Sequence, residues 1–102
     1  MSLKLIDSIF KKTIKKGKLT ILFPDEKKLI YGTTSTAYPD IIINVKNESF
    51  FKEIINKGNL GIGESYMKDY FSVEKGDISD LLDILLVNRL DKVIKDNPKL
   101  LL

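Results

Sequence analysis

The chain has 102 residues, of which 43% are hydrophobic and 30% are charged, and it contains neither cysteine nor histidine. This length supports one domain with its own core and leaves no room for separate cofactor-binding and substrate-binding halves. The missing residue types exclude disulfides, thiolate nucleophiles, the usual zinc ligands and the commonest general base. Any enzymatic chemistry would therefore have to use carboxylates, hydroxyls and lysines, and in combination with the motifs described below we expect no catalytic, cofactor-binding or metal-binding residue within the chain.

The net charge of +3 is distributed unevenly. The first 18 residues contain six lysines and a single acidic residue, Asp7, so this segment carries +5 and the rest of the chain −2. Such a basic segment indicates local attraction to an anionic surface. Nucleic acid is not an expected partner, because no recognition motif is present and no aromatic residues alternate with the lysines.

Neither a membrane span nor an export signal is expected. The longest purely aliphatic run, residues 84–87, is far shorter than the ~20 residues that cross a bilayer. Asp7 and Ser8 interrupt the apolar part of the N-terminus before it reaches the length of a signal peptide. The sequence therefore predicts a cytoplasmic protein.

In chain order, residues 3–16 form the first predicted element, an amphipathic helix with a lysine-rich outer face. Residues 19–23 and 29–33 read as two strands joined by a turn at 24–27, and the β-branched run 41–45 reads as a further strand buried on both faces. Asn47 can cap a helix that ends at Gly58. The apolar positions of these two helices are Leu5, Ile6, Ile9, Phe10, Ile14, Phe50, Phe51, Ile54 and Ile55.

A last and longest helix is predicted from Asp77 to Pro98, because leucine, isoleucine and valine recur there on one broad face. Asp77, Asp80 and Asp83 recur every three residues, a spacing that could be imagined as a metal site, but capping and a favourable first-turn charge are the preferred interpretation. The fold class is α+β: a small single domain with an N-terminal amphipathic helix, short antiparallel strands and helices packed on the sheet.

Between these elements lies the stretch GNLGIGESYMKDYF, residues 58–71. Its glycine spacing fits neither a dinucleotide-binding loop nor a P-loop. Gly58 is expected to end the preceding helix, and Gly61 and Gly63 to allow close backbone approach. If the segment is helical, one of its faces carries Leu60, Gly63, Met67 and Phe71. We expect this face to pack in the core. A serine nucleophile at Ser65 would need a base, which a chain without histidine lacks.

Three blocks in this order resemble the N-terminal domain of cyclopropane-fatty-acyl-phospholipid synthases: KGKLTILFPDEKKLIYG, IIINVKNESFFKEIINKG and LGIGESYMKDYFSVEKGDISDLLDILLVN. Together they cover roughly residues 15–90. The string Gly-Ile-Gly-Glu-Ser-Tyr-Met is the most specific part. Lys68 and Asp69 depart from the family's usual Met-Asp-Gly-Trp continuation, and no glycine follows Pro24 and Asp25 in the hairpin.

The resemblance implies a non-catalytic N-terminal accessory domain of a larger protein, in which S-adenosylmethionine and the catalytic residues belong to a C-terminal methyltransferase domain. It makes Glu64, Ser65, Tyr66 and Met67 candidates for contact with that domain, alongside a purely internal role in the fold. It also raises an anionic phospholipid surface as a partner for Lys4, Lys11, Lys12, Lys15 and Lys16, whose ordinary alternative is a solvated helix face.

Several alternatives stay open at this stage. A free-standing lipid carrier and an interaction module without lipid affinity are the rival functions, and peripheral attachment to the inner face of the membrane accompanies the lipid hypothesis. A homodimer of the full-length protein is equally open. The terminal run Leu100, Leu101 and Leu102 is expected to be exposed, which favours an isolated piece of a longer protein.

Overall fold

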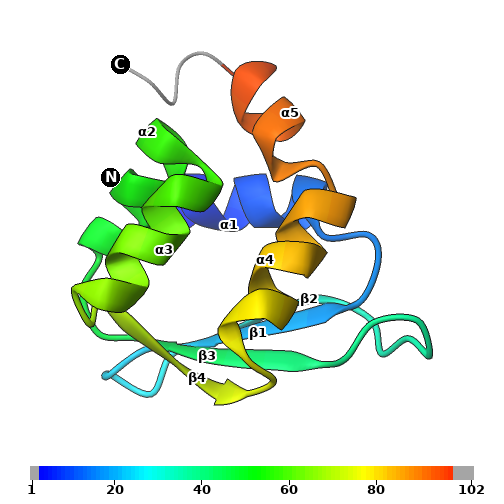
Figure 1. The fold of residues 1–102 in the computed structure, drawn as a ribbon, viewed down its shortest axis with the longest axis horizontal. Coiled ribbons are helices and arrows are strands. Elements are labelled where there is room, and N and C mark those ends of the chain that lie inside the picture. Colours follow the sequence, from blue (N-terminus) through cyan, green and yellow to red (C-terminus); the bar gives the residue numbers. More distant parts are fainter. Residues whose placement is uncertain (1–2, 98–102) are drawn as a thin grey trace.

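A computed structural model describes residues 3–97, which form five helices and four strands. The four strands make one sheet, and the helices lie together on one side of it (Figure 1). The predicted α+β class is confirmed. The expectation for residues 98–102 lies outside the described residues.

The sheet has the strand order β2-β1-β3-β4. β1 (Lys18–Leu22) and β2 (Lys28–Gly32) form the predicted antiparallel hairpin, and β3 (Ile41–Val45) is the predicted third strand. Its predicted burial on both faces is wrong, because the helices cover one side of the sheet (Figure 1) and alternate residues of β3 stay only partly buried. β3 pairs with β1 in parallel, however, with Leu19 opposite Ile41. The expectation of antiparallel strands therefore holds for two of the three pairings, because residues 33–40 carry the chain back across the hairpin before β3 begins.

The fourth strand, β4 (Phe71–Lys75), was not predicted. It pairs antiparallel with β3, with Phe71 opposite Val45. Sequence periodicity placed Phe71 on the same helical face as Met67, but the chain turns between them: Asp69 adopts a left-handed conformation with φ of 61°. This turn ends the helix and directs Phe71 into the sheet, where its side chain is buried.

The core lies between the sheet and the helices, and all five helices contribute buried residues to it. α1 (Leu3–Thr13) and α2 (Ser49–Lys57) bury their predicted apolar faces, except that Leu5 is 38% exposed. Aromatic rings connect the layers: Phe10 stacks on Tyr31 of β2 at a centroid distance of 5.6 Å, and Phe50 lies 4.5 Å from Phe71. Burial of these aromatic and aliphatic side chains is the main driving force for folding.

The cap of α2 differs from its prediction by one residue. Asn47 precedes the helix by two positions, and its Oδ1 accepts a hydrogen bond from the backbone N–H of Ser49 at 2.9 Å. The side chain therefore still satisfies a donor of the first turn, although Glu48 occupies the capping position itself. Gly58 ends α2 with φ of 59°, as expected for a glycine stop.

The predicted long C-terminal helix is wrong as one element, since the chain forms α4 (Ile78–Val87) and α5 (Leu90–Lys95). Arg89 is left-handed, with φ of 57°. Beside it, Asn88 Oδ1 accepts from the backbone N–H groups of Lys15 and Lys16 at 2.9 and 2.8 Å, and Nδ2 donates to the Lys16 carbonyl at 2.8 Å. The helix is therefore interrupted next to Asn88, whose side chain connects the end of α4 to the segment after α1 by hydrogen bonds.

Candidate functional site

The GNLGIGESYM segment forms the helix α3 (Asn59–Met67), which packs against α2. The two helices meet at Gly61, where a Cβ atom would lie 2.0 Å from the backbone oxygen of Glu53. Only glycine permits this approach. Gly63 behaves differently, because a Cβ there would meet nothing within 4 Å. The predicted close approach is therefore confirmed at Gly61 and wrong at Gly63.

Glu64 belongs to a charged network between α2 and α3. Its carboxylate lies 2.7 Å from Lys57 Nζ, which also approaches Glu53 at 3.4 Å, and Lys68 approaches Glu53 at 3.8 Å. The hydrogen bond from Lys57 holds the pKa of Glu64 below its usual value and raises the pKa of Lys57. Glu64 is thus engaged within the domain.

Ser65 is inside the fold. Its side chain has no exposed surface, and its Oγ has no hydrogen-bond partner among the described residues. Its backbone carbonyl accepts from the Tyr70 N–H at 2.9 Å, which helps to close the turn that leads into β4. A small side chain is what this position requires, because α3 packs closely there.

Tyr66 and Met67 remain accessible. Tyr66 is 47% exposed and its ring lies 5.7 Å from that of Phe71, while Met67 is 86% exposed. The four candidate contact residues therefore do not share one environment: Ser65 is buried, Glu64 is held in a partly exposed ion pair, and Tyr66 and Met67 face solvent. Leu60 is also 65% exposed, so the core packing predicted for the face of Leu60, Gly63 and Met67 is wrong.

The candidate lipid-contact lysines are all exposed: Lys4, Lys11, Lys12, Lys15 and Lys16. Lys11 pairs with Asp7 at 3.2 Å, and Lys15 Nζ donates to the Lys11 carbonyl at 3.2 Å. α1 ends at Thr13, before the helix end predicted next to Gly17, so Lys15 and Lys16 lie in the following segment that Asn88 holds. These side chains form an accessible basic surface on and after α1.

The aspartates of α4 cap the helix. Asp77 Oδ1 accepts from the Asp80 N–H at 2.9 Å and Asp80 Oδ2 accepts from the Asp77 N–H at 3.0 Å, a reciprocal capping box. Hydrogen bonds from Ser79 and the Asp80 backbone lower the pKa of Asp77. The capping interpretation is confirmed. Residues 3–97 bring together no group of three acidic side chains that could hold a metal ion.

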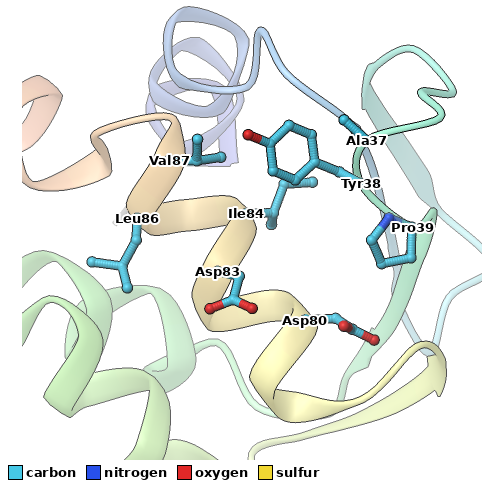
Figure 2. Close-up of a pocket in the computed structure, with 8 residues that line it drawn as sticks. All are labelled: Ala37, Tyr38, Pro39, Asp80, Asp83, Ile84, Leu86 and Val87. Atoms are coloured by element: carbon cyan, nitrogen blue, oxygen red, sulfur yellow. The ribbon is translucent and has the colours of Figure 1, made fainter.

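Asp83 takes no part in the capping box and faces a groove between α4 and the loop before β3 (Figure 2). Tyr38, Pro39 and Ala37 line the loop side, and the volume is about 520 Å³. Sequence reasoning missed this groove, because loop residues 37–39 carry no periodic signal and their position beside α4 depends on the crossing from β2 to β3.

No helix within residues 3–97 is long and apolar enough to cross a membrane. Accessible features of the described residues include the basic surface of α1, the exposed side of α3 and the groove beside α4.

Residues 5–97 match the model of a family described as "Domain of unknown function (DUF7884)", and the chain belongs to this family. It is also similar to the cyclopropane-fatty-acyl-phospholipid synthases of Escherichia coli strains K12 and O6:H1, with 38% identity to each over 60 residues. The matched segment is 57% of this chain and 16% of each synthase. No solved structure matches the chain.

Proposed function

We propose that this domain is a non-catalytic accessory domain of an S-adenosylmethionine-dependent lipid methyltransferase related to the cyclopropane-fatty-acyl-phospholipid synthases. The observation that carries the proposal is the 38% identity to the two synthases over 60 residues. The match covers 16% of each synthase, which leaves most of their length for a methyltransferase part. In this proposal the domain presents lipid to that part or organises it.

Two features of the described residues support an accessory role over an independent catalytic one. Glu64 is held in an ion pair and Ser65 is buried, so the most enzyme-like side chains of the glycine-rich segment do not converge on one substrate. The accessible lysines on and after α1 can pair with the phosphate groups of anionic phospholipids. Each basic residue near an anionic bilayer contributes roughly 1 kcal/mol to binding. The domain would then act at the inner face of the membrane.

Immunoprecipitation tests this function directly. An antibody against this chain is used on extracts of the source cells, and the precipitate is assayed for transfer of labelled methyl groups from S-adenosylmethionine to phospholipid. The expected result is methyl transfer together with a band well above 11.6 kDa, the mass of this chain. Methyl transfer with a band at 11.6 kDa would assign the two parts to separate polypeptides.

A precipitate that transfers no methyl group would contradict the proposal. Organic extraction of the purified chain gives a second readout, because a free-standing lipid carrier would release bound phospholipid and an accessory domain would not. An interaction module without lipid affinity would show neither bound lipid nor binding to vesicles.

A further inference from the structure

Gly63 has no explanation within the described part of the chain. It lies inside α3, where glycine is destabilising relative to alanine because it adds backbone freedom to the unfolded state. Its φ is not positive, since the glycines with positive φ among the described residues are Gly17, Gly32, Gly58 and Gly76. A Cβ at Gly63 would enter open space, in contrast to Gly61. Residues 3–97 thus contain no reason for a glycine here.

The neighbours of Gly63 on the helix surface are apolar and exposed. Leu60 precedes it by three residues and Met67 follows it by four, so the three positions lie on one side of α3. Leu60 is 65% exposed and Met67 is 86% exposed. We call Leu60, Gly63 and Met67 the α3 face. A large apolar side chain on each side of a glycine forms a shallow depression that a second helix can enter closely.

The charges beside the α3 face indicate whether a lipid surface or a protein binds there. Lys57, at the end of α2, and Lys68, directly after α3, are the cations of the ion-pair network beside this face, and both lie within ion-pair distance of Glu53 or Glu64. Two cations and two anions leave no net charge to attract an anionic bilayer. An apolar centre with a balanced polar rim is instead the composition of a protein interface. A lipid surface would also gain nothing from a glycine.

We propose that the α3 face is the docking surface for an apolar helix of the methyltransferase part. The inference rests on the proposed function, which requires such a part, and it assigns the contact to Leu60, Gly63 and Met67. The synthases extend far beyond the matched segment, which is 16% of their length, so a partner of the required size exists in the relatives. Glu64, four residues after Leu60, borders this surface with its ion pair to α2, and Ser65 lies buried behind it.

Site-specific cross-linking in the source cells tests the surface. A photoreactive amino acid replaces Met67, and in a matched variant it replaces Ile30, which is 51% exposed on the sheet and not on a helix. The expected result is a cross-link from position 67 to a peptide of the methyltransferase, in the same or a separate polypeptide, and none from position 30. Cross-links to lipid, to a second copy of this domain, or equally from both positions would overturn the proposal.

Substitutions at Gly63 supply the second test. In the 102-residue chain, Gly63→Ala is expected to raise the midpoint of thermal unfolding by about 2–6 °C, because the methyl group has free space and alanine favours the helix. Gly63→Leu fills the depression, so the cross-linking yield from position 67 should fall at least about tenfold. Asn56→Leu, at an exposed position of α2, is the control and should leave the yield within about twofold.

The outcomes separate this inference from the proposed function. Undiminished cross-linking in Gly63→Leu, with methyl transfer still present in the immunoprecipitate, would overturn the docking surface and leave the accessory role intact. Loss of methyl transfer from the immunoprecipitate of the unaltered protein would overturn both. A thermal midpoint that falls in Gly63→Ala would show that an internal contact requires the glycine, which also contradicts the proposal.

Discussion

Helices α2 and α3 have the same length, nine residues, and pack against each other, yet they place their apolar residues in opposite environments. α2 buries Phe50, Phe51, Ile54 and Ile55 against the sheet and its neighbours. α3 buries two small residues, Gly61 and Ser65, together with Ile62, and its larger apolar side chains at positions 60 and 67 face solvent. Apolar periodicity therefore identifies a helix face, but the elements packed around the helix determine whether that face is buried or exposed.

Truncating one side chain from each helix is the strongest test of this difference. Phe50 is 1% exposed and contacts the rings of Phe51 and Phe71, so Phe50→Ala should lower the free energy of unfolding by about 3–5 kcal/mol. Met67→Ala should change it by less than about 0.5 kcal/mol. Urea unfolding followed by circular dichroism measures both variants. Equal losses would mean that the α3 face is packed inside the domain.

The two glycines of α3 give the next largest difference. Gly61→Ala places a methyl group against the Glu53 backbone oxygen and should lower the free energy of unfolding by about 1–3 kcal/mol. Gly63→Ala meets no neighbour and should raise it by about 0.5–1 kcal/mol. The same urea titration compares them, and a result of the same sign for both variants would refute the packing described for α3.

The comparison extends to α1, which buries its apolar face as α2 does and is also fixed by a polar contact. The Tyr31 hydroxyl donates a hydrogen bond to Asp7 Oδ1 at 2.7 Å. This bond lowers the pKa of Asp7, while burial, more than the neighbouring carboxylate, raises the pKa of Tyr31. Tyr31→Phe should cost about 1–2 kcal/mol at pH 7, since it removes a hydrogen bond to a charged group.

The sign of the pH dependence follows from these two pKa directions. The contribution of Asp7 is present above about pH 4, its ordinary pKa, and is lost as the pH falls through the lower folded value. The contribution of Tyr31 is present below about pH 10 and is lost as the pH rises beyond it. Urea titrations across pH 2–7 should therefore show a smaller difference between Tyr31→Phe and the unaltered chain in acid. A constant difference would contradict the assignment.

The smallest effect on stability is expected for the basic surface of α1. The variant with glutamine at Lys11, Lys12, Lys15 and Lys16 should unfold within about 0.5 kcal/mol of the unaltered chain, because these side chains are exposed. Its binding to vesicles containing phosphatidylglycerol should fall by about a hundredfold or more at low ionic strength.

A matched variant on α3 sharpens this last result. Leu60→Ser combined with Met67→Ser removes the exposed apolar side chains of the α3 face and should leave vesicle binding unchanged, because that face is assigned to a protein partner. If this double variant loses vesicle binding as strongly as the lysine variant, the α3 face contacts lipid, and its assignment to a protein partner is wrong.

The candidate site was only partly predictable. The sequence indicated the glycine stop at Gly58, which depends on the last turn of α2, and the close approach at Gly61, which involves Glu53 only eight residues earlier in the chain. It could not indicate that Ser65 is buried while Met67 is exposed, because that division depends on where α2 and β4 lie around α3. The groove at Tyr38 and Asp83 was missed for a similar reason, since a loop and a helix form it from distant parts of the chain.

Local chemistry was sufficient to predict the apolar faces of α1 and α2, the hairpin turn, the β-branched strand β3 and the aspartate cap of α4. The parallel pairing of β1 with β3, the existence of β4, the break before α5 and the exposure of the α3 face follow from contacts between distant parts of the chain. Helical periods and caps depend on neighbours a few residues away. Strand pairing, and contacts such as Asn88 with Lys15, depend on groups up to 73 residues apart, whose meeting only the folded chain establishes.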